Sequence, residues 1–428
     1  MNATSSSSVP ASKPALMPLD EALSRILAQT SILPTQWVNT FEADRRVLAQ
    51  DVVSEVQVPP LDNSAMDGYA VRTADLPEPG GVLPVTQRIP AGSLGKPLEP
   101  LSAARIFTGA PVPEGADAVV MQEECQIVNE CEGGVRIQIA PKRGQNIRRA
   151  GEDIHLGDKV LQRGAVLGPA HLGLAASVGL AALPVSTRPR VALLSTGDEL
   201  VMPGEIAPQD MARLRPGAIY NSNRFFLRAM LERLGCVVTD MGVIPDQREA
   251  TVAALREAAT QHDLIVSTGG VSVGEEDHVK PAIKSLGALN LWSLNIKPGK
   301  PFAFGQINRS GTDSGPCQFM GLPGNPVASW VTFLLLVRPA VLAMQGVTET
   351  ALPVREAIAH FDCPRVERRR EFLRVRETAH GLELFPNQSS GVLTSVVWAD
   401  GVVDNPPGHT IAKGDTVRWV AWKDLLAL

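Results

Sequence analysis

Residues 190–344 alternate between short apolar runs and longer segments in which apolar residues recur at helical spacing. The apolar runs predict buried strands at 191–195, 236–243, 264–267, 291–296, 302–306 and 318–321. The longer segments, whose apolar residues fall on one face, predict helices at 222–234, 248–260, 277–286 and 326–337. Strands and helices in this order predict a doubly wound α/β domain over residues 188–348.

The chain before this domain follows other patterns. Apolar residues at helical spacing predict helices at 20–29 and 168–183, and we expect the second helix to pack against the first. Between them, residues 59–153 are rich in Gly and Pro, and short β-branched runs predict a small inserted β-rich domain. This domain would interrupt a stalk formed by residues 15–58 and 154–187. Its expected strands include 82–89, 105–108, 118–121 and 135–139.

The two ends of the chain differ from the middle. Residues 1–14 are rich in Ser and Pro and have no apolar core, so we expect a disordered tail and not a signal peptide. After Pro353, short strands separated by Gly, Pro and Asp predict an all-β domain over 349–428. Its expected strands are 372–376, 381–384, 402–403 and 416–422.

Composition narrows the classes of function. The 428 residues carry a net charge of −5 and 4% aromatic residues, so neither a basic field nor a base-stacking surface for nucleic acid is expected. The apolar run 330–337 is interrupted by Arg338 and Pro339, and we expect it to be too short to cross a membrane. The 5 cysteines are odd in number and lack Cys-x-x-Cys spacing, which favours a reducing, cytoplasmic environment over a disulfide or zinc framework.

Two predicted strands of the α/β domain run into Thr-Gly loops that end in carboxylates. Their candidate residues are Thr196, Gly197, Asp198, Glu199, Gly269, Gly270, Ser272 and Asp277. The carboxyl ends of parallel strands meet at one edge of a sheet, where loop amides can bind phosphate and carboxylates can bind a metal ion. An ordinary turn with Asp198 as its hydrogen-bonding residue, and a helix N-cap at Asp277, are alternatives that the sequence leaves open.

Two further loops add a candidate anion site and candidate cations. Residues 322–326 follow the last predicted strand, and Asn325 with Pro326 is typical of an N-cap followed by Pro at the first helical position. Such a helix start also attracts anions. Lys297 and Lys300 lie in a Pro/Gly loop, where they could neutralise phosphate, and solvated surface lysines are the alternative.

The predicted inserted domain carries small polar motifs at 62–69, 105–111 and 145–153. The candidate residues in these motifs are Asp67, Thr108, Arg148 and Asp153. Turns held by Asx hydrogen bonds, and surface ion pairs, are the alternatives to a binding role. The 7 histidines show no metal-ligand spacing, and the sequence has no Walker A, Gly-x-Ser-x-Gly or Rossmann fingerprint.

Taken in order, these strings resemble the molybdopterin molybdenumtransferase family, which includes the bacterial MoeA proteins and the gephyrin E domain. The matching segments are 60–72, 106–123, 144–154, 189–200, 267–277, 296–304 and 321–327. The resemblance implies an enzyme that inserts molybdate into adenylylated molybdopterin and releases AMP, with Mg²⁺ as the metal ion. It also implies an elongated homodimer of four-domain subunits, with a molybdopterin-binding α/β domain and a small C-terminal β-barrel.

The resemblance also assigns roles by motif position. The residues implied as catalytic are Asp67, Thr108, Glu199, Asp246 and Asp277, and three of them, Glu199, Asp246 and Asp277, would bind the metal ion. The residues implied to bind the molybdopterin substrate are Arg148, Asp153, Thr196, Gly197, Gly269, Gly270, Ser272, Lys297, Lys300, Pro323, Gly324, Asn325, Pro326, Arg374 and Ser390. The inserted domain of one subunit would face the α/β domain of the other, so that each cleft is shared.

Other functions remain open at this point. A molybdopterin adenylyltransferase or a nucleotide hydrolase would share the α/β domain, and a non-catalytic gephyrin-like scaffold would share the whole architecture. The extra β domains and the loops of Asp67 and Thr108 favour the transferase, and the single α/β pattern in this sequence disfavours the scaffold. We expect small-molecule substrates and contacts with other proteins of molybdenum cofactor biosynthesis, and no nucleic-acid or membrane partner.

Overall fold

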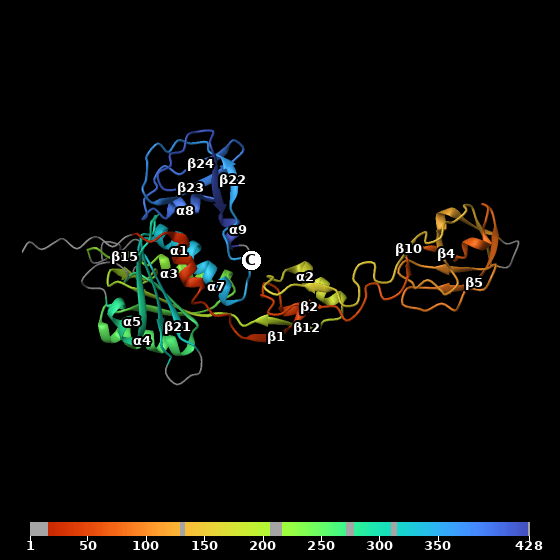
Figure 1. The fold of residues 1–428 in the computed structure, drawn as a ribbon, viewed down its shortest axis with the longest axis horizontal. Coiled ribbons are helices and arrows are strands. Elements are labelled where there is room, and N and C mark those ends of the chain that lie inside the picture. The colour runs from red at the N-terminus through yellow and green to blue at the C-terminus, as the bar shows by residue number, and fades with distance from the viewer. Residues whose placement is uncertain (1–15, 129–132, 206–215, 271–277, 310–314, 427–428) are drawn as a thin grey trace, which may run out of the picture.

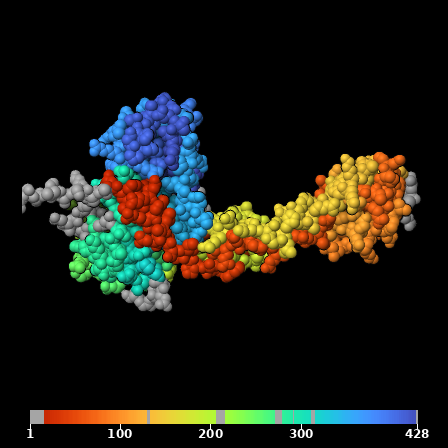
Figure 2. All heavy atoms as spheres, viewed as in Figure 1, coloured from red at the N-terminus to blue at the C-terminus, as the bar shows by residue number. Residues whose placement is uncertain are grey.

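The computed structural model describes residues 16–128, 133–205, 216–270, 278–309 and 315–426. The chain folds into an elongated molecule (Figure 1). An α/β domain and a C-terminal β domain lie together at one end, another β domain lies at the far end, and a narrow stalk joins them (Figure 2). The chain passes along the stalk twice, because the distant β domain is inserted between the two stalk segments.

A six-stranded sheet forms the centre of the α/β domain, in the order β16-β13-β17-β21-β20-β18. Its strands are β13 Arg190–Thr196, β16 Val237–Ile244, β17 Leu264–Thr268, β18 Gly287–Ser293, β20 Pro301–Ile307 and β21 Cys317–Leu322. β16, β13, β17 and β21 are parallel, and β20 and β18 complete the sheet as antiparallel strands. Every residue of β17 is buried, as expected for a parallel strand that is covered on both faces.

Helices cover both faces of this sheet, which confirms the predicted doubly wound α/β fold. They are α3 Asn223–Arg233, α4 Arg248–Gln261, α5 Val279–Leu286, α6 Pro326–Thr332 and α7 Arg338–Met344. On one face, α3 and α6 contribute Leu227 and Val331 to the core. On the other face, α4 and α5 contribute Leu255 and Ile283 to a separate core. A short parallel pair, β14 Leu200–Val201 with β15 Ile219–Tyr220, follows β13 in the chain.

The first helix, α1 Leu19–Leu27, packs on the α/β domain and not on the stalk. Its buried residues Leu19, Ala22 and Ile26 lie on one face and join the same core as α7. The prediction that the second N-terminal helix packs against it is therefore wrong. That helix, α2 Pro169–Ser177, contacts the stalk strand β11 Lys159–Leu161.

The stalk contains two small antiparallel pairs. β1 Thr35–Asn39 pairs with β12 Ala182–Ser186, and β2 Val52–Val53 pairs with β11. The predicted helix 168–183 thus ends early, since Gly179, with a φ of 83°, follows α2 and leaves Ala182 in a strand. The described residues of the N-terminal half also form short 3₁₀ turns at η1 Thr40–Glu42, η2 Thr73–Asp75 and η3 Gln122–Glu124.

The inserted domain is a six-stranded sheet in the order β7-β4-β6-β5-β9-β8, as the predicted β-rich insertion requires. Its strands are β4 Gly68–Val71, β5 Val82–Ile89, β6 Ala103–Ile106, β7 Ala118–Met121, β8 Cys125–Val128 and β9 Gly134–Ile137. A short pair, β3 Asn63–Ser64 with β10 Ile147–Arg148, lies on the stalk side (Figure 1). The two chain segments meet at a neck, where Val58 N donates to Ile154 O at 2.8 Å and Ile154 N donates to Val58 O at 3.1 Å.

The C-terminal domain is the expected small β-barrel. Its strands are β22 Arg355–Ile358, β23 Arg370–Thr378, β24 Gly381–Leu384, β25 Gly401–Asn405 and β26 Thr416–Ala421, with helices α8 Thr394–Trp398 and α9 Trp422–Leu426. The order β24-β23-β25-β26-β22 is closed by a bridge between Ala359 and Leu382. A two-residue strand of the α/β domain, β19 Ile296–Lys297, pairs with β23 and joins the two domains.

The helical segment that begins at Pro326 is longer than predicted. α6 continues through a π-helical turn, η5 Phe333–Val337, into α7, so Arg338 and Pro339 do not end it. In a regular helix the ring of Pro339 would clash with the preceding turn, and the wider π turn accommodates it. The 19-residue segment is long and apolar enough to cross a membrane, but 89% of its apolar window is buried inside the protein, as in a core helix.

Candidate active site

A cavity of about 1000 Å³ opens at the carboxyl edge of the α/β sheet, between the loops that follow β13, β17 and β21. The predicted site residues that line it are Thr196, Gly197, Glu199, Asp246, Gly269, Gly270, Lys297, Lys300, Pro323, Gly324, Asn325, Pro326 and Ser390. The C-terminal domain closes one side with Arg369 and residues 388–391. Two other predicted residues, Ser272 and Asp277, lie outside the described residues. Segments far apart in the sequence therefore meet at this edge of the sheet.

Gly269 at this edge leaves no room for a side chain. A Cβ at Gly269, whose φ is 89°, would lie 2.5 Å from the backbone oxygen of Thr196. Gly197 has a φ of 131°, which L side chains rarely adopt. The two Thr-Gly loops therefore pack directly against each other. Thr196 lines the cavity, and its buried hydroxyl has no hydrogen-bond partner among the described residues. Such a hydroxyl is available to a ligand oxygen.

Glu199 and Asp246 form the acidic side of the cavity. Glu199 follows β13, Asp246 follows the neighbouring strand β16, and the Asp246 amide donates to Asp198 Oδ1 at 3.4 Å. Within the described parts of the chain, no group of three or more His, Cys, Asp or Glu side chains is placed to hold a metal ion, and the third expected ligand, Asp277, lies outside them. Mg²⁺ needs only one or two carboxylates beside water and substrate phosphates, so the two carboxylates fit this ion.

The sequence reasoning missed two asparagines that lie just before and at the start of α3. Asn223 Nδ2 donates to Thr268 Oγ1 at 2.8 Å and to the Gly324 carbonyl at 2.7 Å, so it ties the loop after β17 to the loop after β21. Asn221 Nδ2 donates to Ser195 Oγ at 3.0 Å. Both asparagines are buried. A signal was present, because one asparagine just before the predicted helix and another in its first turn are suited to side-chain hydrogen bonds with loops.

The start of α6 differs from the predicted N-cap. Pro326 occupies the first turn as expected, but the Asn325 side chain makes no capping hydrogen bond. The Val327 amide instead donates to the Ser390 carbonyl at 3.0 Å. The C-terminal domain therefore satisfies one of the first amides of this helix, which would otherwise be free for an anion.

The two lysines of the cavity have different surroundings. Lys297 Nζ lies 2.7 Å from Glu371 Oε1 and 3.2 Å from Glu367 Oε2, whereas Lys300 is exposed and forms no ion pair with a described residue. Partial burial opposes the ionisation of Glu367, but hydrogen bonds from Arg369 and Lys297 outweigh it and lower the pKa of Glu367 to about 2. Lys297 is therefore not the unpaired cation that the sequence suggested.

Arg374 supports the cavity without lining it. The residue is 1% exposed, and its guanidinium donates to the Ser389 carbonyl at 3.2 Å and to Ser395 Oγ at 3.3 Å. Its amide donates to Gln388 Oε1 at 2.9 Å. Burial lowers the pKa of Arg374 to about 10. Arg374 thus holds the loop 388–391 against the cavity, and the substrate contact implied by the resemblance stays a prediction.

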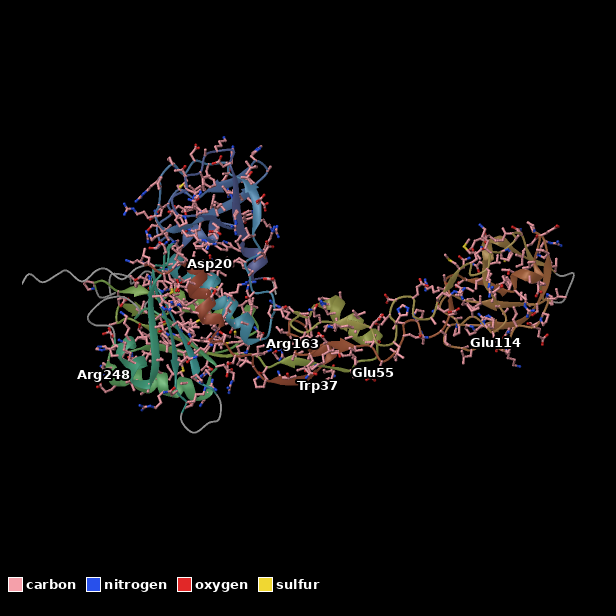
Figure 3. The ribbon with its side chains drawn as sticks, viewed as in Figure 1. Asp20, Trp37, Glu55, Glu114, Arg163 and Arg248 are labelled. Carbon is pink, nitrogen blue, oxygen red and sulfur yellow. The ribbon has the colours of Figure 1, made fainter. Side chains whose placement is uncertain are left out.

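The remaining predicted residues lie in the inserted domain, at the opposite end of the molecule, where Glu114 is labelled in Figure 3. Asp67 Oδ1 accepts hydrogen bonds from the Thr108 amide at 2.8 Å and from the Thr108 hydroxyl at 2.7 Å, and these bonds lower the pKa of Asp67. Arg148 and Asp153 are exposed nearby in the same domain. None of these residues lines the cavity of the same chain.

Comparison with known proteins identifies the family. The family model of the MoeA N-terminal region (domain I and II) matches residues 17–179, that of a probable molybdopterin binding domain matches 192–343, and that of the MoeA C-terminal region (domain IV) matches 356–422. The chain is 42% identical to a molybdopterin molybdenumtransferase of Haemophilus influenzae, over 84% of this chain and 85% of the relative. It is 37% identical to molybdopterin molybdenumtransferase 2 of Mycobacterium tuberculosis, over 85% of this chain and 89% of that protein.

A solved structure agrees with these matches. The crystal structure of a molybdopterin biosynthesis MoeA protein of Pyrococcus horikoshii aligns with a TM-score of 0.79 at 27% identity. The alignment covers 95% of this chain and 100% of the other. Sequence relatives and architecture therefore agree from the first helix to the C-terminal barrel. This chain belongs to the molybdopterin molybdenumtransferase family.

Proposed function

We propose that this protein inserts molybdenum into molybdopterin, with adenylylated molybdopterin and molybdate as substrates and AMP as the leaving product. The observation that carries the proposal is the single cavity shared by Glu199, Asp246, Lys297 and Lys300 at the ends of parallel strands. A site with carboxylates and cations together suits a substrate that brings phosphates and a metal ion at the same time. The relatives named above are molybdopterin molybdenumtransferases, and this chain matches most of the length of each.

The residues of the cavity have separable tasks in this proposal. Glu199 and Asp246 would hold Mg²⁺, and the bound ion would supply positive charge at the phosphoanhydride. Lys300 neutralises a phosphate, and the Thr196 hydroxyl donates a hydrogen bond to a phosphate oxygen. The absence of a side chain at Gly269 lets the backbone approach the same group closely. An oxygen of molybdate would attack the phosphorus on the molybdopterin side of the phosphoanhydride. A new P–O bond would form as the bond to the bridging oxygen breaks, and AMP would leave with that bridging oxygen.

One chain supplies too little positive charge for this substrate. The charged side chains that line the cavity are the cations Lys297, Lys300 and Arg369 and the carboxylates Glu199 and Asp246. Because Lys297 and Arg369 are already paired with Glu367 and Glu371 behind the lining, a substrate with several phosphates requires Mg²⁺ and further cations. Arg148 of the inserted domain is exposed and makes no ion pair with a described residue, which suits it to this purpose.

A second subunit would supply these groups. The stalk exposes 67% of Trp37 in β1, which is labelled in Figure 3, and 95% of Phe41 in the adjoining turn η1. Exposed apolar side chains of this size favour an interface. A symmetric dimer through the stalk would bury them and bring the inserted domain of each subunit to the cavity of the other. Asp67, Thr108 and Arg148 would then complete the cleft from the opposite side.

The test uses the purified full-length protein with adenylylated molybdopterin, molybdate and Mg²⁺, and AMP is measured by chromatography. AMP should appear in proportion to the molybdenum inserted, and removal of Mg²⁺ with a chelator should stop both. AMP release that is equally fast without molybdate would instead indicate a hydrolase. Consumption of ATP with formation of adenylylated molybdopterin would indicate an adenylyltransferase, and no reaction at all would favour a scaffold that binds other proteins of cofactor biosynthesis.

A further inference from the structure

The lysine on the cavity wall is held by two carboxylates of another domain. Lys297 belongs to the α/β domain, whereas Glu367 and Glu371 belong to the C-terminal domain. The side chains of Glu371 and Glu367 are 8% and 14% exposed, so solvent screens these ion pairs only weakly. The cavity therefore contains a lysine whose charge is largely balanced before any ligand binds.

The backbone fixes this arrangement. β19 pairs in parallel with β23, and the register places Lys297 beside Glu371. An ammonium group has three N–H donors and no acceptor. Two donors are directed to Glu371 and Glu367, so one remains for a ligand in the cavity. The pairing of β19 with β23 thus holds the Lys297 ammonium beside Glu371 and leaves one of its N–H donors for a ligand.

The neighbouring arginine is restrained in a similar way. Arg369 also lines the cavity, and its Nη2 lies 3.3 Å from Glu367 Oε2. Lys297 and Arg369 together are matched by Glu367 and Glu371, so this side of the cavity is close to neutral. Lys300 lies in the same loop as Lys297 and is exposed without an ion pair to a described residue. One cavity therefore offers an unpaired cation and a neutralised pair.

We propose that Glu367 and Glu371 are positioning residues that weaken the hold of Lys297 on small tetrahedral oxyanions and so keep such an anion exchangeable until the main substrate is bound. Molybdate, sulfate and phosphate share size, shape and negative charge. An unpaired lysine in a half-buried pocket would hold all of them, whereas a neutralised lysine holds them weakly. The inference rests on the proposed function, because it assigns the oxyanion to this side of the cavity.

The experiment measures oxyanion affinity by isothermal titration calorimetry with sulfate and with molybdate on the full-length protein. Glu371→Gln and Glu367→Gln should each tighten binding by on the order of tenfold, because each removes a negative charge behind the ammonium. The affinity should also fall more steeply with added salt in these variants. The matched control is Glu383→Gln, a carboxylate of the same barrel that pairs with Arg376 at 3.2 Å and lies outside the cavity, and it should leave affinity unchanged.

The Lys297→Met variant tests whether the two carboxylates change oxyanion affinity through Lys297. In Lys297→Met protein, Glu371→Gln should change oxyanion affinity by less than about twofold, since the ammonium is absent. Tenfold tightening in that background would overturn the proposal, because the carboxylate would then act on the anion directly. Unchanged or weaker binding in both glutamine variants, or no measurable binding by any variant, would overturn it as well.

Two controls separate this inference from folding and from the proposed function. If Glu371→Gln does not fold, Glu367→Gln carries the same test from the segment that precedes β23. In steady-state assays, the glutamine variants should lower both the KM for molybdate and kcat. A loss of stability alone would not lower the KM. Sulfate affinity can be measured without turnover. A protein that releases no AMP would contradict the proposed function, but its sulfate affinity would still test the roles of Glu367 and Glu371.

Discussion

The cavity of the α/β domain and the Asp67–Thr108 cluster of the inserted domain contain the same kinds of side chain but present them in opposite ways. In the cavity, loops from three strands and a loop of the C-terminal barrel enclose about 1000 Å³. In the inserted domain, Asp67 and Thr108 hydrogen-bond to each other at an exposed loop. The first region has walls from several segments of one chain, whereas the second has no opposite wall in the same chain.

The stalk explains this difference. It holds the two regions at opposite ends of one chain (Figure 1), so they cannot enclose one substrate together within a subunit. If each subunit worked alone, activity would depend only on the cavity. If the subunits of a dimer share their clefts, activity would depend on both regions. Mutations in the two regions should therefore complement each other in mixed dimers only if the cleft is shared.

The largest effect is expected from the acidic side of the cavity. Glu199→Gln and Asp246→Asn should each reduce AMP release by on the order of 10²- to 10³-fold, because each removes a proposed ligand of Mg²⁺ and a negative charge from the cavity. AMP is measured by chromatography, and the melting temperature should stay near that of the parent protein. The control is Glu232→Gln, a carboxylate of α3 paired with Arg228 outside the cavity. Near-normal rates for both cavity variants would remove the proposed metal site.

A mixture of two inactive variants tests the shared cleft. Asp67→Asn and Glu199→Gln proteins, exchanged into mixed dimers, should recover about a quarter of the parent activity, because half of the dimers are mixed and each has one intact cleft. The matched control combines Asp67→Asn with Asp153→Asn, both from the inserted domain, and should recover nothing. No recovery in the first mixture, with mixed dimers verified by mass, would show that each subunit works alone.

Asn223 tests how much the cavity depends on its internal ties. Asn223→Ala removes the hydrogen bonds from Asn223 to Thr268 at the end of β17 and to Gly324 after β21, and we expect a loss of about 1–3 kcal/mol in unfolding free energy. AMP release should fall by roughly tenfold as the loops separate. Asn290→Ala, at an exposed position of β18, is the control and should change neither quantity. A fully stable and active Asn223→Ala protein would contradict the role given to this residue.

The smallest expected effect is on the pH dependence of stability. The pKa of Glu367 is about 2 in the folded protein, below its ordinary value of 4.5, so its contribution is present above about pH 4.5 and is lost as the pH falls towards 2. Denaturant unfolding at about pH 5.5 and pH 3 should show a loss on the order of 1 kcal/mol that Glu367→Gln no longer shows. An equal pH response in the two proteins would mean that this carboxylate is not held as the structure shows.

The sequence predicted the α/β domain well, because its strands are short apolar runs with both faces buried. The convergence of Glu199, Gly269 and Pro323 also followed, since the ends of parallel strands meet at one edge. The packing of α1 could not be read in the same way. Its apolar face at Leu19 and Ile26 shows that it is covered, but not which domain covers it.

Other features depend on contacts between distant segments. The pairing of Lys297 with Glu371 arises from the alignment of β19 with β23, and neither residue carries a local signal for it. The bond from Val327 to Ser390 likewise replaced a plausible local cap at Asn325. The continuation of the helix through Pro339 depends on a π turn that ordinary helical periodicity does not reveal. Local sequence patterns thus predicted where helices and strands form. Contacts between distant segments determined how these elements pair and which side chains they bring together.

The backbone hydrogen bonds between Val58 and Ile154 at the neck should allow the inserted domain to be exchanged as a unit. Because the entering and leaving backbones already bond to each other there, residues 59–153 could be exchanged for the corresponding segment of a relative without cutting the stalk. In a shared cleft such an exchange would alter one wall of both clefts and leave the other wall untouched. Natural variation could therefore change that wall independently of the α/β cavity.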